Sequence, residues 1–159
     1  DIAITNRPKF CCLVPEKREE LTTEGGLDLI SNYNQIESAI ASLSNAGIGV
    51  SLFIEPVLEF IEAAKNLKAT SVELHTGNYA NTTDEAQSIE LIKIKEAVSC
   101  GIKNQLTVNA GHGLDYLNVL PIASLSNLSE LNIGHAIVSR ALTVGLKKAV
   151  AEMKTLMER

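Results

Sequence analysis

The chain has 159 residues, 45% of them hydrophobic but only 4% aromatic, so aliphatic side chains must form the core of what is one domain's worth of sequence. The net charge of −5 excludes the basic surfaces typical of proteins that bind nucleic acids or membrane surfaces. No apolar stretch approaches the roughly 18 residues of a membrane span, and no secretory leader is recognisable, so we expect a cytoplasmic protein.

The three cysteines, Cys11, Cys12 and Cys100, lack the CxxC spacing of a metal site. We therefore expect them to be reduced and buried, and we expect no metal.

The chain opens without Met, on residues 1–7, which have the pattern of a helix ended by Pro8. Because a domain rarely begins in the middle of a helix, we expect further sequence upstream. Short runs rich in β-branched and aliphatic residues, bounded by turn residues, then predict five strands. These strands are residues 9–14, 49–54, 71–75, 106–109 and 130–133.

Helical patterns lie between the predicted strands. The first has Ile36, Ile40 and Leu43 on one face and Gly47 as its stop. Pro56 is expected at the first position of the next helix.

The third predicted helix opens with a capping box formed by Thr82 and Glu85, and Ile89, Ile92 and Val98 should face inward. A short helix is expected at residues 117–124. The stretch from His135 onward is helical and divided at Gly145, and its last part repeats apolar residues from Leu146 to Met157.

Repeated strand-then-helix order predicts parallel strands in an α/β fold. Five strands in 159 residues is about 32 residues per unit. Eight such units would need the roughly 250 residues of a (β/α)8 barrel, of which this would be an incomplete one. An open doubly wound sheet is the alternative, but the turn after the first strand, residues 15–20, is not a glycine-rich phosphate loop.

All three histidines, His75, His112 and His135, fall where a predicted strand ends. The carboxyl ends of parallel strands are where such folds build their active sites. Any one of these residues alone is better read as a structural histidine, but three at the same rim favour a site.

Glu73 and His75 are two residues apart in a predicted strand and so point to the same side. A buried carboxylate there would have a perturbed pKa and indicate function. Alternatively, the strand is at an edge with Glu73 in solvent, or a Lys or Arg pairs with it.

Glycines indicate an anion site, because Gly111 and Gly113 flank His112 and Gly134 precedes a helix start. Gly134 as a simple tight turn is the alternative. The polar stretch 15–28 is either a lid with a hinge at Gly25 and Gly26 or a solvated surface loop, and its Thr22 or Thr23 could contact a substrate.

Several of these motifs together closely resemble the bacterial pyridoxine 5′-phosphate synthase family, and the match runs from Pro8 to the C-terminus. The segments are FCCLVPEKREELTTEGGLD, VSLFIE, VELHTGNYA, VNAGHGLDYLNV and ELNIGHAIVSRAL. The resemblance implies strands four to eight of a (β/α)8 barrel in one partial domain, residues 1–159.

The resemblance also implies a ring-forming transferase of vitamin B6 biosynthesis. The reaction condenses 3-amino-2-oxopropyl phosphate with 1-deoxy-D-xylulose 5-phosphate to give pyridoxine 5′-phosphate, phosphate and water, without a metal or organic cofactor. The resemblance further implies a homo-oligomer, which in this family is an octamer.

By the same resemblance, Glu73 matches the transition-state stabiliser and His112 the proton donor. Gly113, Gly134 and His135 match contacts to the aminooxopropyl phosphate, and Thr22 matches a contact to the deoxyxylulose phosphate. No role is implied for His75.

The family's first three strands carry Asn-x-Asp-His and His-x-Arg motifs and a Glu that acts as a base, and none of these is found here. We therefore expect the chain alone to be inactive. Two alternatives remain open. One is a non-catalytic phosphate-binding or assembly module that has lost those strands, and the other is a different phosphate-handling barrel enzyme.

Overall fold

The computed structural model describes residues 1–15 and 25–158 and contains one five-stranded parallel sheet in the order β1-β2-β3-β4-β5. The strands are β1 Phe10–Leu13, β2 Gly49–Ile54, β3 Ser71–His75, β4 Thr107–Gly111 and β5 Leu131–Asn132. A doubly wound sheet reverses its strand order at a switch point. The five strands of the described residues follow one another in sequence order without a reversal, so that alternative is wrong, and the fold is a parallel α/β half-barrel.

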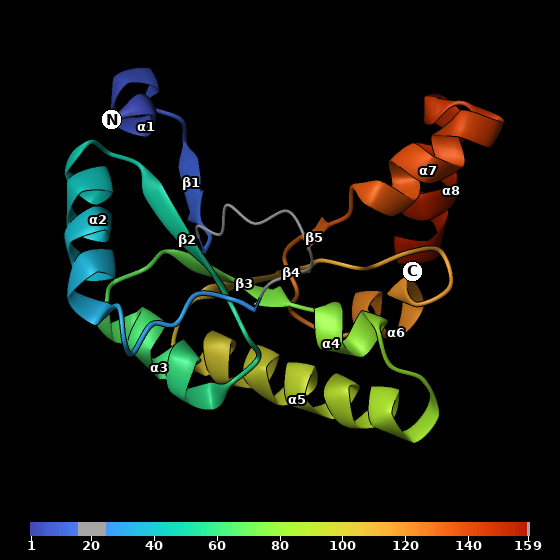
Figure 1. Cartoon of the computed structure of the whole chain (residues 1–159), viewed down its shortest axis with the longest axis horizontal. Coiled ribbons are helices and arrows are strands. Elements are labelled where there is room, and N and C mark those ends of the chain that lie inside the picture. The colour runs from blue at the N-terminus through green and yellow to red at the C-terminus, as the bar shows by residue number, and fades with distance from the viewer. Residues whose placement is uncertain (16–24, 159) are drawn as a thin grey trace.

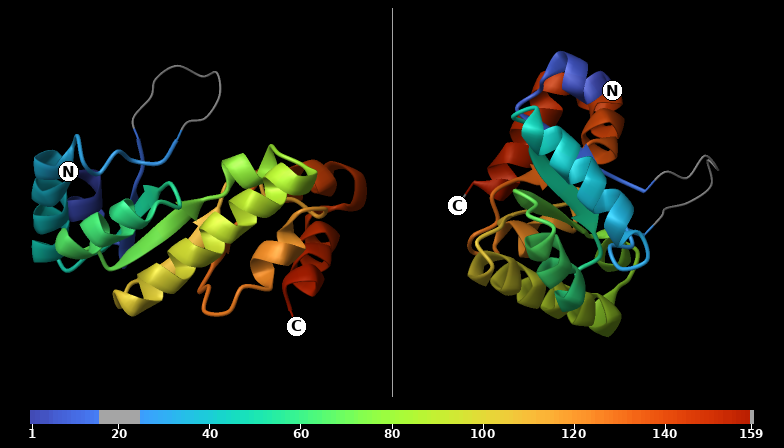
Figure 2. Two further views of the ribbon diagram at one scale, coloured as in Figure 1. Left: turned by 90° about the horizontal axis from the view of Figure 1, so that it is seen from below. Right: turned by 90° about the vertical axis from the view of Figure 1, so that its left-hand side faces the viewer.

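Helices precede, join and follow these strands. They are α1 Ile2–Asn6, α2 Tyr33–Asn45, α3 Leu58–Asn66, α4 Gly77–Ala80, α5 Asp84–Lys103, α6 Val119–Ala123, α7 His135–Val144 and α8 Leu146–Met157. Figures 1 and 2 show α2, α3, α5 and α6 along the outer side of the curved sheet. The α1 end and the α7–α8 end rise on opposite sides of the concave face (Figure 1).

The two faces of the sheet differ in chemistry because side chains alternate along a strand. Val50, Leu52, Val72, Leu74 and Val108 are fully or almost fully buried and form the core with residues of the outer helices. The concave face instead carries polar groups. These include Cys12, Ser51, Glu73, Asn109 and Asn132.

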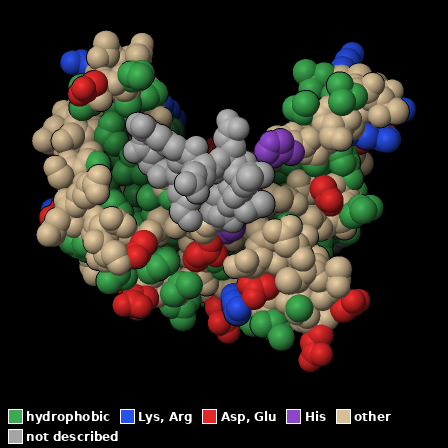
Figure 3. All heavy atoms as spheres, viewed as in Figure 1, with side chains coloured by type: hydrophobic (Ala, Val, Ile, Leu, Met, Phe, Trp, Pro, Cys, Tyr) green, Lys and Arg blue, Asp and Glu red, His purple; other side chains and the backbone are tan. Residues whose placement is uncertain are grey.

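Apolar side chains also reach the surface on both arms that border the concave side (Figure 3). They include Ile2 in α1, Phe10 in β1, and Val138 and Leu142 in α7.

Four local expectations are corrected by the structure. Pro56 precedes Val57, which is the N-cap of α3, so it does not occupy the first helical position. No capping box forms at α5, because its N-cap is Thr83 and the hydroxyl of Thr82 donates to the Asn78 and Tyr79 carbonyl oxygens instead.

The inward face of α5 is formed by Ile94, Ala97, Val98 and Gly101. Ile89 and Ile92, expected to face inward, are 48% and 56% exposed. The cysteines are free thiols but less buried than expected, with Cys12 exposed and the other two half-buried. Within residues 1–15 and 25–158, no helix has the length and apolar character needed to cross a membrane.

Candidate active site at the carboxyl ends of the strands

The three histidines lie at the same rim of the sheet, as predicted. His75 is the last residue of β3, His112 directly follows β4, and His135 is the first residue of α7. The imidazole rings of His75 and His112 have centroids 4.8 Å apart. His135 lines the same pocket as His112.

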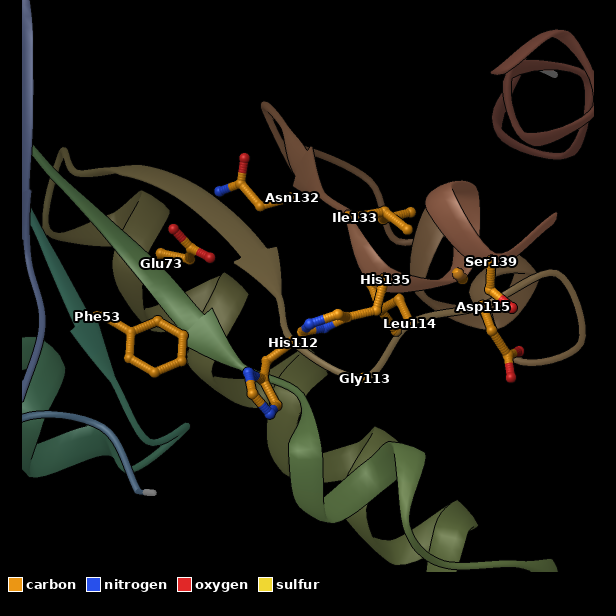
Figure 4. Close-up of a pocket in the computed structure, with 12 residues that line it drawn as sticks. Phe53, Glu73, His112, Gly113, Leu114, Asp115, Asn132, Ile133, His135 and Ser139 are labelled. Carbon is orange, nitrogen blue, oxygen red and sulfur yellow. The ribbon is translucent and has the colours of Figure 1, made fainter. Parts of the chain in front are cut away.

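This pocket has a volume of about 510 Å³, within the range of small-molecule sites. The residues that line it include Glu73, His112, Gly113, Asn132, Gly134 and His135. Figure 4 shows the side chains around it, which come from the ends of successive strands and from the start of α7. Five of the six residues proposed from the sequence therefore share one cavity.

The sixth, Thr22, lies outside the described residues, as does Thr23. Gly25 and Gly26 are described, and the Gly26 N–H donates to Glu55 Oε1 at 2.9 Å. Whether these glycines act as a hinge stays a prediction.

The turn that carries His112 is held by buried hydrogen bonds. The Thr76 hydroxyl lies 2.8 Å from the Gly111 carbonyl oxygen and 2.6 Å from that of His112. His112 has a φ of 84°, a left-handed conformation that costs about 1–3 kcal/mol in a non-glycine residue. Strain of this kind is typical of functional positions, and the fully buried Thr76, which sequence reasoning missed, helps to maintain it.

Gly111 is required by close packing beside this turn. A Cβ at this position would lie 2.7 Å from Glu73 Oε1 and 2.9 Å from the backbone oxygen of Asn132. Glycine therefore lets the Glu73 carboxylate reach the space between β4 and β5.

Glu73 lies in the central strand β3, paired on both sides, so the edge-strand alternative is wrong. Among residues 1–15 and 25–158 no Lys or Arg pairs with it. Burial raises the pKa of Glu73 above its usual value, although hydrogen bonds from Asn132 and Cys12 oppose this. The carboxyl group therefore lies on the concave face, and no Lys or Arg among the described residues balances its charge.

The neighbouring thiol of Cys12 lies 3.9 Å from Glu73 Oε2. Although Cys12 as a whole residue is exposed, partial burial of its thiol and the nearby Glu73 carboxylate raise the pKa of Cys12 to about 11. The thiol thus stays protonated and can donate to Glu73.

The opposite wall is the N-terminus of the ten-residue helix α7. The first N–H groups of a helix have no partner within the helix and attract anions. Gly134 is the N-cap, and a Cβ there would meet nothing within 4 Å, so open space lies in front of its backbone. The arrangement can accept a phosphate group beside His112.

Glu55, which sequence reasoning left without a role, directly follows β2. Its Oε1 lies 2.7 Å from Nδ1 of His75. The two residues are 20 positions apart, so only the register of β2 and β3 brings them together. In the described part of the chain, no group of three or more His, Cys, Asp or Glu side chains is placed to hold a metal ion.

Fold and site together define a parallel α/β half-barrel with a pocket at the carboxyl ends of its strands, where barrel enzymes have their active sites. The chain belongs to the family described as "Pyridoxal phosphate biosynthesis protein PdxJ", whose sequence model matches residues 1–159.

Its relatives include proteins named pyridoxine 5′-phosphate synthase. That of Magnetococcus marinus is 57% identical over 152 residues, which are 95% of this chain and 63% of that protein. That of Blochmanniella pennsylvanica is 52% identical over 159 residues, 99% of this chain and 65% of the relative. A Legionella pneumophila protein is 54% identical, with 99% and 64% coverage. The chain thus spans slightly less than two thirds of the length of these relatives.

Proposed function

We propose that this chain is part of a pyridoxine 5′-phosphate synthase that condenses 3-amino-2-oxopropyl phosphate with 1-deoxy-D-xylulose 5-phosphate. The observation that carries the proposal is the pocket in which Glu73 and His112 face the N-terminus of α7. The relatives named as this synthase, at 52–57% identity, support it.

In this reaction His112 acts as the proton donor, because it lies at a rigid turn with its ring beside the pocket. Glu73 stabilises charge that develops in the transition state. Burial raises its pKa, and hydrogen bonds from Asn132 and Cys12 oppose that rise by favouring the ionised form, which could interact with a cationic intermediate.

Gly113, Gly134 and His135 bind the phosphate of the aminooxopropyl substrate. All three line the pocket, and Gly134 leaves its backbone open to a ligand. Thr22 contacts the deoxyxylulose phosphate, and no metal or organic cofactor takes part.

The complete enzyme is a (β/α)8 barrel in which this chain supplies strands four to eight as one partial domain, residues 1–159. The sequential order of a curved parallel sheet supports this arrangement. The first three strands supply the proton acceptors, so the chain alone is inactive. The complete protein is a cytoplasmic homo-oligomer, an octamer.

The test is formation of pyridoxine 5′-phosphate from the two substrates by the full-length product of the gene that encodes this chain. We expect turnover by that protein and none by residues 1–159 alone. Absence of turnover by the full-length protein, with both phosphates still bound, would instead favour a phosphate-binding module.

A further inference from the structure

A second carboxylate, that of Glu55, directly follows β2. Glu55 Oε1 is 2.7 Å from His75 Nδ1 and also accepts the Gly26 N–H at 2.9 Å. Glu55 Oε2 lies 3.5 Å from the side-chain nitrogen of Asn78. His75 is only 5% exposed, so this contact is largely shielded from water.

Burial acts to raise the pKa of Glu55, but hydrogen bonds from His75 and Gly26 and attraction to His75 and His112 outweigh it and lower the pKa. Glu55 is therefore a carboxylate, which can only accept hydrogen bonds. It follows that Nδ1 of His75 is the donor, and Nε2 carries the lone pair when the ring is neutral.

The ring of His75 packs beside the ring of His112, so the orientation of the first ring affects that of the second. The two ring centroids are 4.8 Å apart at an interplanar angle of 56°, and Phe53 packs edge-on against His75 at 5.2 Å. His75 Nε2 is buried and has no hydrogen-bond partner among residues 1–15 and 25–158. A buried polar atom in this state costs free energy, and in native structures such atoms are found at functional positions.

Because Gly77 has no side chain, the rings of His75 and His112 can both pack against it. A Cβ at this position would lie 2.5 Å from His75 Nε2 and 3.3 Å from Cδ2 of His112. Both rings thus border the same glycine, and a larger residue would push them apart.

We propose that Glu55 is a positioning residue that acts through His75 to orient His112 and favour its protonated form. The proposal rests on the proposed function, in which His112 must carry a proton to donate it. The charge of Glu55 stabilises a cation nearby, and the hydrogen bond to His75 fixes the ring against which His112 packs.

Other titratable groups also face His112. Among the described residues they include Glu73 from β3, Asp115 from the turn after β4 and His135 from α7, which line the same pocket as His112. A test must therefore separate the effect of Glu55 on the pKa of His112 from the effects of these groups and of the net charge.

The chain is suited to this measurement because it contains only three histidines. Labelled imidazole resonances, followed by NMR against pH, report His75, His112 and His135 separately. In Glu55→Gln, which retains an acceptor for the Gly26 N–H, we expect the pKa of His112 to fall by roughly 0.5–1 unit. His135 serves as the internal reference and should move much less.

Glu59→Gln is the matched control, because it removes the same charge from an exposed position in α3, four residues along the chain. An unchanged His112 pKa in Glu55→Gln, or an equal fall in Glu59→Gln, would overturn the proposal. If Glu55→Gln does not fold, the same titration is made on Glu55→Asp, in which we expect a smaller fall in the pKa of His112. An unchanged pKa of His112 in that variant would also overturn the proposal.

In the full-length protein, the basic limb of the kcat–pH profile should move to lower pH by the same amount in Glu55→Gln, with KM nearly unchanged. In Glu55→Asp the basic limb should lie closer to its wild-type position, because a carboxylate is retained. A purely structural role of Glu55 would instead lower kcat equally at all pH values, and that result would contradict the proposal. A wild-type protein without synthase activity would overturn the proposed function alone, since the histidine titration is read without substrate.

Discussion

Glu73 illustrates the conflict between stability and function at a single residue. Its pKa is raised by burial, so ionisation at neutral pH destabilises the folded state relative to the unfolded chain. A group whose pKa is higher in the folded than in the unfolded state stabilises the fold fully at pH values below its unfolded-state pKa. This contribution to the free energy of unfolding is lost as the pH rises through the folded-state pKa.

We therefore expect Glu73→Gln to raise the thermal midpoint by about 1–3 °C at pH 7–8, a small effect because the carboxyl group keeps some contact with water. The gain should vanish well below pH 4.5, the ordinary pKa of a glutamate, where Glu73 is protonated in both states. Thermal melts of both proteins across pH 4 to 8 measure this, and a lower midpoint for the variant at pH 8 would contradict it.

His112 offers a complementary test in the full-length protein. His112→Asn should lower kcat by about 10²- to 10⁴-fold, because the amide has no transferable proton. Asparagine tolerates left-handed backbone, so the φ of 84° at this position should be kept and the fold little affected. Steady-state kinetics with a thermal melt as the folding control decides this, and near-normal turnover would remove His112 from the mechanism.

At the scale of elements, the strands were largely predictable from the sequence because each is a short aliphatic run bounded by turn residues. β2 and β3 match their predicted bounds, whereas β4 begins at Thr107 and extends to Gly111. The start of α5 was not predictable. The hydroxyl of Thr82 has a competing partner in the short helix α4, and that partner is only visible once α4 exists.

The position of the candidate site was predictable to the same extent. Strand ends mark the three histidines, and glycines mark the turns beside them, whereas anion binding at these turns stays a prediction. Glu55 was missed because its partner His75 is reached across β2 and β3, and no local pattern reports a cross-strand contact. Thr76 was missed for the same reason, since its partners Gly111 and His112 are 35 and 36 residues away.

The N-terminus of α7 can be tested on this chain without catalysis. We expect inorganic phosphate to bind between the Gly111–Gly113 turn and Gly134 with millimolar affinity, about −4 kcal/mol, because other phosphate ligands come from elsewhere in the proposed barrel. Gly134→Val should abolish binding by blocking approach to the backbone. Since a Cβ at Gly134 meets nothing within 4 Å, the variant should still fold.

Phosphate titration followed by amide NMR measures this binding, with shifts expected at Gly113, Gly134 and His135. Gly47 follows the C-terminal end of α2, where the helix dipole disfavours anions, so its amide is the reference for non-specific effects. Shifts confined to amides near surface lysines, with the two turns unmoved, would show that the anion site is wrong.

At the scale of the whole molecule, the half-barrel has apolar side chains on both sides of its concave face. Ile2 in α1 is 82% exposed and Leu142 in α7 is 87% exposed. β1 pairs only with β2 among the described strands, which leaves one row of its backbone groups open to pairing. Exposed aliphatic patches and open strand edges both favour association with other chains.

We therefore expect residues 1–159 in isolation to associate, or to rearrange around β1, and to give a concentration-dependent mass in sedimentation experiments. Lysine at Ile2 and Leu142 together should reduce the association, because charged groups there would have to lose water on contact. Ile92→Lys is the control, since Ile92 is 56% exposed but lies on the outer helix α5. A stable monomer with an ordinary thermal midpoint would contradict the prediction, and dissociation caused by Ile92→Lys alone would move the contact from the margins of the half-barrel to its outer face.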